Sequence, residues 1–361
     1  MQIILFIIGL LLLIGGAELL VRGASRLAAS IGISPLVIGL TVVAFGTSSP
    51  ELAVSIKSAL TDKAGLSLGN VVGSNIFNVL FILGLSAIIT PLTVSQQLIR
   101  FDVPLMIILS FLVLFFTLDG NINHWNGIIL FIGLMIYIGF LIYTSKKENS
   151  KVKEEYAKEF SEKEKSSFGW LKNGFYVILG LIFLIFGSEW LVESAIIFAQ
   201  YIGISEVVIG LTIVAAGTSL PEVVTSVIAS IRGERDIAVG NVVGSNIFNI
   251  MGVLGMSSIV APSGIDVSSS FIGFDIPIMI GVAFICLPIF FTGGRITRPE
   301  GFLFLGYYII YTIYLIMNTS HHDALPIFNA IVLYFILPIT FLTLIIISVH
   351  EIYKSKNKSN V

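Results

Sequence analysis

The sequence predicts an all-α integral membrane protein of two five-helix halves in inverted orientation, ten transmembrane helices in all, with one extra transmembrane helix at the C-terminal end. Composition is the first observation: of 361 residues, 56% are hydrophobic and 12% are charged, and the mean hydropathy is +0.99. The second is that apolar residues come in long unbroken runs, which excludes a water-soluble globule, a disordered chain and a transmembrane barrel. The third is a long internal repeat.

Eleven apolar runs are long enough to cross a bilayer, which takes about 20 residues of α-helix. In chain order they cover residues 2–21, 35–59, 67–91, 102–118, 124–144, 173–199, 206–231, 237–261, 274–292, 298–317 and 326–349. The first run lacks a preceding basic segment and a small-residue cleavage site. We therefore expect it to be retained as a span and not removed as a signal peptide.

The spans divide the chain into four segments. The first repeat covers residues 1–144, a charged linker covers 145–172, the second repeat covers 173–317, and residues 318–361 hold the extra helix and a basic tail. We interpret the linker as a solvated helix with charge pairs along it, and contact with lipid head groups or a partner is the alternative. It is too short for a separate sensor domain of the usual size.

Basic residues indicate the orientation, because cytoplasmic loops carry an excess of Lys and Arg. With the N-terminus outside and eleven spans, 18 of the 20 basic residues fall on the inside, and only Lys57 and Lys63 lie outside. Ten spans would leave three lysines of the tail on the outer face, so the charges favour the eleventh. The sequence thus predicts a multi-pass protein of the cell membrane with the 145–172 loop and the C-terminus in the cytoplasm.

An internal repeat dominates the chain. Residues 15–91 realign with residues 186–262 at a constant offset of 171, with 38 of 77 positions identical and no gap. The strongest blocks are Gly-Thr-Ser-x-Pro-Glu at 46–51 and 217–222, and Gly-Asn-Val-Val-Gly-Ser-Asn-Ile-Phe-Asn at 69–78 and 240–249. Five spans separate each position from its copy, and an odd number places the copies upside down relative to each other. Inverted repeats are typical of secondary transporters, with the substrate site at the repeat interface.

Glu51 and Glu222 lie at matched positions inside apolar spans, where a carboxylate is costly and marks function by default. Two that converge carry up to two negative charges, which suits a hard divalent cation. A proline precedes each glutamate and frees backbone carbonyls one turn earlier, as in broken helices that line sites at membrane depth. The alternative is a pair of buried structural carboxylates kept neutral.

Neutral oxygens accompany the two carboxylates. Thr47 and Thr218 lie four residues before the glutamates and share their helix faces. The second block adds Ser74 with Asn78, and Ser245 with Asn249, again at i and i+4. An oxygen-only set favours Ca²⁺, Mg²⁺ or Na⁺ over Zn²⁺ or Cu²⁺. For Ser and Asn alone, hydrogen bonding between helices is the alternative.

Three other acidic residues have simpler interpretations. Arg22 follows Glu18 at i+4, so the two are expected to pair, with a gate or interface role as the alternative. Asp102 and Asp275 stand near the starts of spans, two residues before a proline, and fit helix N-caps.

The doubled blocks resemble the two alpha repeats of the cation/calcium exchanger superfamily, best its prokaryotic sodium/calcium exchanger branch, over residues 1–317. The resemblance implies ten helices in two inverted halves and Na⁺-driven Ca²⁺ transport by alternating access, in which either ion permits the first and sixth spans to slide. The resemblance implies that Glu51 and Glu222 are the Ca²⁺ carboxylates, shared with Na⁺, and that the carbonyls of Thr47 and Thr218 complete the Ca²⁺ site. It implies Na⁺ sites formed by the side chains of Ser48, Ser219, Ser74 and Ser245 and the carbonyls of Ala44 and Ala215. Asn78 and Asn249 would lie in the middle of the same cluster.

Two departures from the family matter. Asn249 stands where some relatives, including potassium-dependent ones, carry Asp, which argues against K⁺ co-transport. The run 326–349 lies beyond the usual end of the family.

Two other transporter classes remain open: a Ca²⁺/H⁺ antiporter, and an exchanger of another divalent cation such as Mg²⁺ or Mn²⁺. A cation channel or a membrane scaffold is disfavoured by one inverted pair per chain. No enzyme motif appears, so we expect no enzymatic activity and no cofactor, only Ca²⁺ and Na⁺ as transported ions. The net charge of −2 gives no reason to expect nucleic acid as a partner. The lipid bilayer is the expected surrounding, and the protein is expected to function as a monomer.

Overall fold

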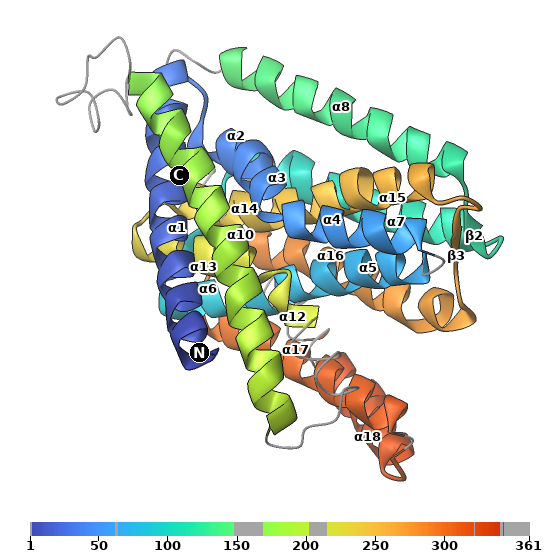
Figure 1. Cartoon of the computed structure of the whole chain (residues 1–361). Coiled ribbons are helices and arrows are strands. Elements are labelled where there is room, and N and C mark those ends of the chain that lie inside the picture. The colour runs from blue at the N-terminus through green and yellow to red at the C-terminus, as the bar shows by residue number, and fades with distance from the viewer. Residues whose placement is uncertain are drawn as a thin grey trace, which may run out of the picture.

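The computed structural model describes residues 2–61, 64–147, 169–201, 215–320, 322–339 and 342. Over these ranges the chain is almost wholly helical (Figure 1). The α-helices are α1 (Gln2–Ile31), α2 (Pro35–Ile38), α3 (Ala44–Thr47), α4 (Ser49–Leu60), α5 (Gly65–Phe77), α6 (Gly84–Ile89), α7 (Val103–Thr117), α8 (His124–Lys147), α10 (Gly169–Tyr201), α12 (Ala215–Gly217), α13 (Leu220–Ile231), α14 (Arg235–Phe248), α15 (Gly255–Val260), α16 (Ile276–Phe291), α17 (Arg298–Thr319) and α18 (Leu325–Ile331).

Short π-helical segments join several of these helices. They are η1 (Gly39–Val43), η2 (Asn78–Leu83), η3 (Leu98–Asp102), η5 (Asn249–Leu254), η6 (Phe271–Asp275) and η7 (Val332–Ile336). The strands form two antiparallel ribbons at the loops, β1 (Leu92–Thr93) with β4 (Arg295–Ile296) and β2 (Asn121–Ile122) with β3 (Ile265–Asp266). Each ribbon ties a loop of the first repeat to a loop of the second.

Within the described ranges, eight helices are long and apolar enough to cross a membrane, or nine if one bent pair counts as a single span. They fall on nine of the predicted spans. Of the predicted span 206–231, residues 215–231 are described, and they include α12 and α13. Of the predicted eleventh span, the described part is the apolar helix Leu325–Ile339. The linker lies outside the described residues except at its two ends.

The bent pair is the broken helix that the Pro-Glu motif predicts. The axes of Pro35–Thr47 and Ser49–Leu60 differ by 47°. Ser48 leaves the helical region with φ −82° and ψ 8°, and Pro50 occupies the first turn of α4. Since proline has no N–H, it fits the first turn of a new helix better than the interior of a continuous one. Ser219 repeats this geometry before α13, with φ −88° and ψ 8°.

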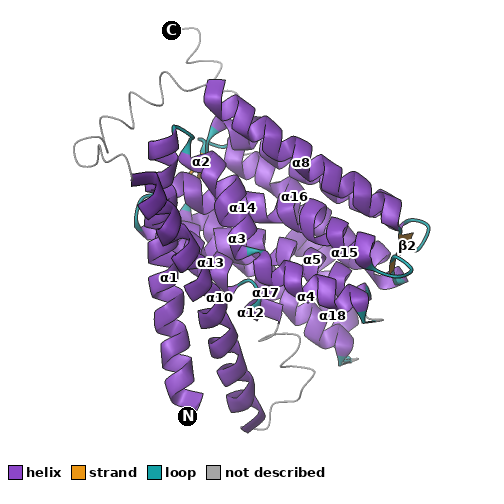
Figure 2. Ribbon diagram, turned by 45° about the horizontal axis from the view of Figure 1, so that its top comes forward, coloured by secondary structure: helices purple, strands orange, loops and turns teal. Residues whose placement is uncertain are grey.

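Helices α1 and α10 lie side by side, and both run across the direction of most other helices (Figures 1 and 2). They run antiparallel, because Gly9 meets Gly187 at one end and Gly16 meets Gly180 further along. A Cβ added at Gly180 would lie 2.7 Å from the carbonyl oxygen of Gly16, and one at Gly187 would lie 2.8 Å from that of Gly9. Only glycine permits so close an approach of two helix backbones in a membrane.

Helix α14 and its continuation to Val260 form the centre of the molecule, because every residue of the most apolar 18-residue stretch of Arg235–Val260 is buried. Helix backbones also approach closely here, because a Cβ at Gly244 would lie 2.7 Å from the Cα of Leu40. Its copy Gly73 has nothing within 4 Å among the described residues. Residue 211, the copy of Leu40, lies outside them.

The N-cap interpretation of Asp102 and Asp275 is wrong. Neither side chain makes a cap hydrogen bond. Asp102 instead accepts from the hydroxyl of Tyr137 on α8 at 2.9 Å, and Asp275 from that of Tyr311 on α17 at 3.2 Å. A helix continues on the N-terminal side of each aspartate through η3 and η6, so the N–H groups that a cap would serve are already bonded.

Candidate cation site

The two motif glutamates lie in the first turns of the helices that follow the two breaks. Glu51 is the third residue of α4 and Glu222 the third of α13, and each residue is only 1% exposed. The first turn of a helix offers unbonded N–H groups and the positive end of its dipole, which stabilises a carboxylate there. The local sequence Ser-x-Pro-Glu thus builds both the break and the position of the acid.

The two motifs are joined by crossed hydrogen bonds. Ser48 Oγ donates to Glu222 Oε1 at 2.8 Å, and Ser219 Oγ donates to Glu51 Oε1 at 2.8 Å. Each serine therefore serves the glutamate of the other copy, 174 and 168 residues away in sequence. Ser219 also lies 3.4 Å from Ser74 Oγ, which brings the second block to the same place.

The second oxygen of each carboxylate is buried without a hydrogen bond from any described residue, and so are the amide oxygens of two asparagines. These four acceptors are Glu51 Oε2, Glu222 Oε2, Asn78 Oδ1 and Asn249 Oδ1. The hydroxyls of Thr218 and Ser245 are in the same condition. A buried acceptor without a donor costs about 1–3 kcal/mol, and more for a charged group. Buried acceptor oxygens of this kind, which occur here in two matched pairs, are the type of ligand that hard cations take.

A further pair of asparagines, which sequence reasoning did not single out, supports the glutamates. Asn70 Nδ2 donates to Ser55 Oγ at 2.9 Å and to the main-chain carbonyl of Glu51 at 3.3 Å. Asn241 makes the same bonds to Ser226 Oγ at 2.9 Å and to the carbonyl of Glu222 at 3.5 Å. Ser55 and Ser226 are identical between the copies within a stretch that otherwise differs, and this was the available signal.

The remaining predicted residues occupy the same region with different partners. Thr47 Oγ1 donates to Asn241 Oδ1 at 3.0 Å, so its hydroxyl holds the asparagine that bonds to the main chain of Glu222. The carbonyl of Ala44 accepts the N–H of Ser48 at 3.0 Å as part of the helix. Ala215 begins the described helix α12. Cation coordination by the carbonyls of Thr47, Thr218, Ala44 and Ala215 stays a prediction.

No group of three or more His, Cys, Asp and Glu side chains that could hold a metal ion occurs in the described part of the chain. The oxygens at the site come from two carboxylates and from neutral hydroxyl and amide groups. Such a set suits hard cations better than Zn²⁺ or Cu²⁺, which prefer nitrogen or sulfur ligands.

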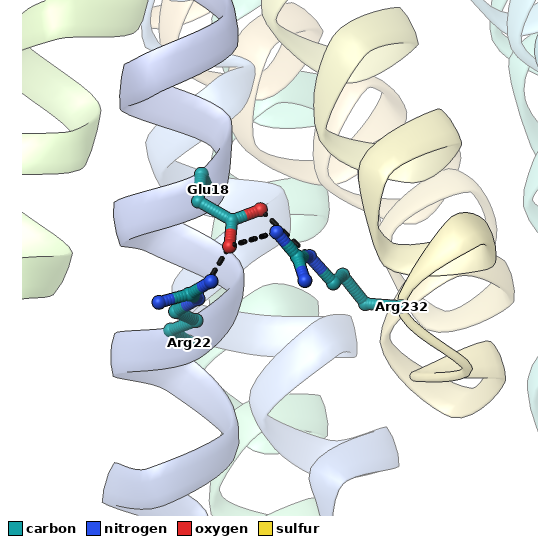
Figure 3. Close-up of polar contacts among 3 residues, drawn as sticks. All are labelled: Glu18, Arg22 and Arg232. Carbon is teal, nitrogen blue, oxygen red and sulfur yellow. Dashed lines mark hydrogen bonds and ion pairs between the residues drawn. The ribbon is translucent and has the colours of Figure 1, made fainter.

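Glu18 takes part in a separate ion cluster (Figure 3). As predicted, it pairs with Arg22 on the same helix. It also receives Arg232 from the end of α13, with Nη2 at 2.6 Å from Oε1 and Nε at 2.9 Å from Oε2. The cluster thus ties α1 to a helix that carries one of the site glutamates.

The chain is similar to a known protein family and to known relatives over most of its length. The family described as sodium/calcium exchanger protein matches residues 1–144 and 172–317. The chain is 34% identical over 343 residues to the sodium/calcium exchanger MaX1 of Methanosarcina acetivorans, covering 86% of this chain and 97% of that one. It is 35% identical over 289 residues to the inner membrane protein YrbG of Escherichia coli, covering 78% and 87%. The solved structure of the sodium/calcium exchanger from Methanococcus jannaschii superposes with a TM-score of 0.74 at 30% identity, covering 86% and 97%.

Proposed function

Because the chain belongs to the sodium/calcium exchanger protein family, we propose that it exchanges Na⁺ for Ca²⁺ across the membrane at one site shared by both ions. The observation that carries this is the crossed pair of buried glutamates, each with one oxygen bound by a serine of the other copy and one oxygen that receives no hydrogen bond from the described residues. Two carboxylates match the charge of one Ca²⁺. The surrounding neutral oxygens extend the set for Na⁺ ions that occupy it in turn.

Alternating access supplies the exchange. Without a bound ion, the two carboxylates are charged, and covering them with the apolar parts of the moving helices is costly. Bound Ca²⁺ or Na⁺ neutralises the carboxylates, so the helices can then move across the site. The moving part that we propose is the pair α1 and α10. Its glycine contacts support motion of the two helices as one unit, since their backbones touch directly.

The finer architecture belongs to the same proposal: ten transmembrane helices in two inverted halves, 1–144 and 173–317, followed by an extra span. The contacts support it by their reciprocity. Gly9 contacts the carbonyl oxygen of Gly187. The offset of 171 pairs Gly9 with Gly180 and Gly16 with Gly187, and Gly180 in turn contacts the carbonyl oxygen of Gly16. Copies that return each other's contacts across antiparallel helices are related by a two-fold axis in the membrane plane, as in other transporters with inverted repeats.

The orientation is proposed from the charges, with the N-terminus outside and the linker and C-terminus in the cytoplasm. A reporter fused after Lys358 tests it. A cytoplasmic signal is expected, and an extracellular one would contradict the eleven-span topology. The protein is proposed to act as a monomer, because both glutamates come from one chain.

The ion carried against Ca²⁺ is tested in proteoliposomes. Vesicles loaded with Na⁺ are diluted into Na⁺-free medium that contains radiolabelled Ca²⁺, and uptake is compared with that driven by a pH gradient without Na⁺. We expect uptake with the Na⁺ gradient and none with the pH gradient alone. Uptake that follows only the pH gradient would make the protein a Ca²⁺/H⁺ antiporter. Competition by Mg²⁺ or Mn²⁺ in the same vesicles tests the exchanger of another divalent cation.

A further inference from the structure

Two asparagines that the proposed ion set leaves out lie at the centre of the molecule. Asn75 and Asn246 stand at matched positions of the second block and are 3% and 2% exposed. Each precedes a ligand asparagine by three residues in its own helix, but its side chain bonds to the asparagine of the other copy. Both ligand asparagines open a π-helical segment, a feature often found at functional sites.

The main chain fixes which way these two amides face. Asn75 Nδ2 donates to the carbonyl oxygen of Asn246 at 3.3 Å, and Asn246 Nδ2 donates to the carbonyl oxygen of Asn75 at 3.2 Å. A carbonyl only accepts, so the nitrogen end of each amide must face it. Each Nδ2 also lies near a buried thioether, Met279 Sδ at 3.8 Å and Met106 Sδ at 3.5 Å. A flip of either amide would set oxygen against oxygen and against sulfur.

The fixed amides in turn orient the ligand asparagines. With its nitrogen held by the main chain, Asn75 presents Oδ1, which accepts Asn249 Nδ2 at 3.2 Å. Asn246 Oδ1 likewise accepts Asn78 Nδ2 at 3.0 Å. The nitrogen ends of both ligand amides are thereby engaged. Their oxygen ends are the buried acceptors without a donor described above.

We propose that Asn75 and Asn246 are positioning residues that hold the amides of Asn249 and Asn78 with their oxygens toward the transported cation and their N–H groups away from it. The side chain of asparagine has an attractive end and a repulsive end for a cation, and they differ only by a half-turn about the last torsion. A carboxylate has no such ambiguity. A site that uses amides in place of carboxylates therefore needs a second group that fixes their direction, as ligands of metals generally do. The inference rests on the proposed function.

A double-mutant cycle tests the first pair. Asn75→Ala is expected to raise the Ca²⁺ concentration for half-maximal Na⁺-driven uptake by about 10-fold to 100-fold, the usual loss for a group behind a metal ligand. Asn249→Ala removes the oriented oxygen itself and should do the same. Because Asn75 acts through Asn249, adding Asn75→Ala to Asn249→Ala should change little further. Independent, multiplying losses would overturn the proposal.

Rescue by a carboxylate separates positioning from folding. In Asn249→Asp both ends of the side chain are oxygens, so its direction no longer matters. Asn75→Ala should then cost less than about threefold in apparent Ca²⁺ affinity, compared with the 10-fold to 100-fold loss beside Asn249. An equal loss in both backgrounds would mean that Asn75 supports the fold only, and would overturn the proposal.

The second pair gives an independent test if Asn75→Ala does not fold. Asn246→Ala should couple to Asn78→Ala in the same way, and should be additive with Asn249→Ala. If Asn246→Ala instead coupled to Asn249→Ala, its neighbour in the same helix, the crossed geometry would be contradicted. Ser110→Ala is the matched control, because Ser110 is equally buried but, among the residues that the structure describes, its hydroxyl bonds only to the Met106 carbonyl of its own helix. It should leave the affinity unchanged.

Two further readouts keep the inference apart from the proposed function. If the wild-type protein takes up no Ca²⁺ in response to Na⁺, the proposed function fails. In that case the cycle is measured as Ca²⁺ binding to the purified protein by calorimetry. If wild-type uptake is Na⁺-driven but the cycles are additive, the positioning role alone fails.

Discussion

Alanine at Gly16 tests the contact between α1 and α10, because a matched control lies next to it in the same helix. The added Cβ of Gly16→Ala would lie 2.8 Å from the Gly180 carbonyl oxygen and 2.9 Å from the amide nitrogen of Leu184. A carbon and a carbonyl oxygen usually approach to about 3.3–3.6 Å, even in the close contacts of helix pairs. The two helices would have to separate by roughly half an ångström along their whole contact, since both neighbours are backbone atoms.

The expected cost follows from this geometry. Overpacking of a close contact costs about 1–3 kcal/mol. Part of it is offset because alanine favours the helix over glycine by about 1 kcal/mol. Gly15→Ala has the same offset without the clash, since no atom of the described ranges lies within 4 Å of a Cβ there. The difference in stability between the two variants, about 1–3 kcal/mol, therefore isolates the packing term.

Thermal unfolding of the purified proteins in one detergent measures that difference. Gly16→Ala should unfold several degrees below Gly15→Ala, and Gly15→Ala should equal or exceed the wild type. Gly180→Ala strains the same contact from the other side, so the double variant with Gly16→Ala should lose less than the sum of the two. Equal midpoints for Gly15→Ala and Gly16→Ala would refute direct backbone contact between the helices.

Three other predictions concern the site and the ion cluster. Glu51→Gln and Glu222→Gln each remove a carboxylate from the buried pair, and Ca²⁺ uptake into proteoliposomes should be abolished; wild-type flux in both variants would reject the site. Ser48→Ala removes a hydrogen bond to the Glu222 carboxylate, a type of bond that contributes about 1.5–3 kcal/mol, so the Ca²⁺ concentration for half-maximal uptake should rise about tenfold or more. Arg232→Gln breaks a partly exposed ion pair with Glu18 and should lower the unfolding midpoint slightly at low salt and not in 1 M salt; a loss that persists at high salt would contradict the electrostatic account.

Much of the fold could be predicted from the sequence because a bilayer imposes strong rules. Unbroken apolar runs give the spans, and a proline followed by a glutamate inside such a run gives both the broken helix at Ser48 and its acid. The gap-free repeat indicates that Glu51 and Glu222 can converge, and the bond of each to a serine of the other copy agrees with this. These inferences use length, periodicity and symmetry, all of which are visible in one chain.

The parts that could not be predicted depend on how helices are rotated against one another. Nothing in the sequence says that Asn75 bonds across the two copies while Asn78, three residues on, has an oxygen with no donor in the described part of the chain. Asp102 looks like a helix cap because a proline follows it, but the π-helical turn before it satisfies the backbone and leaves the side chain for Tyr137. The pair of Glu18 and Arg232 is likewise set by the packing of α1 on α13 and not by spacing.

The reciprocal contacts of α1 and α10 have the form of an isologous dimer interface, in which residue i of one subunit touches j of the other and j touches i. In a dimer of identical chains every substitution appears on both sides. Here the two partners are parts of one polypeptide, so each can change alone. Arg232 binds Glu18, and the position 171 residues earlier is Thr61, which carries no charge. Covalent continuity thus lets the second copy form an ion pair for which the first copy, with Thr61 at the matched position, has no charged counterpart. In the alternating access that we propose, this asymmetry gives the inward-facing and outward-facing states a physical reason to differ in energy.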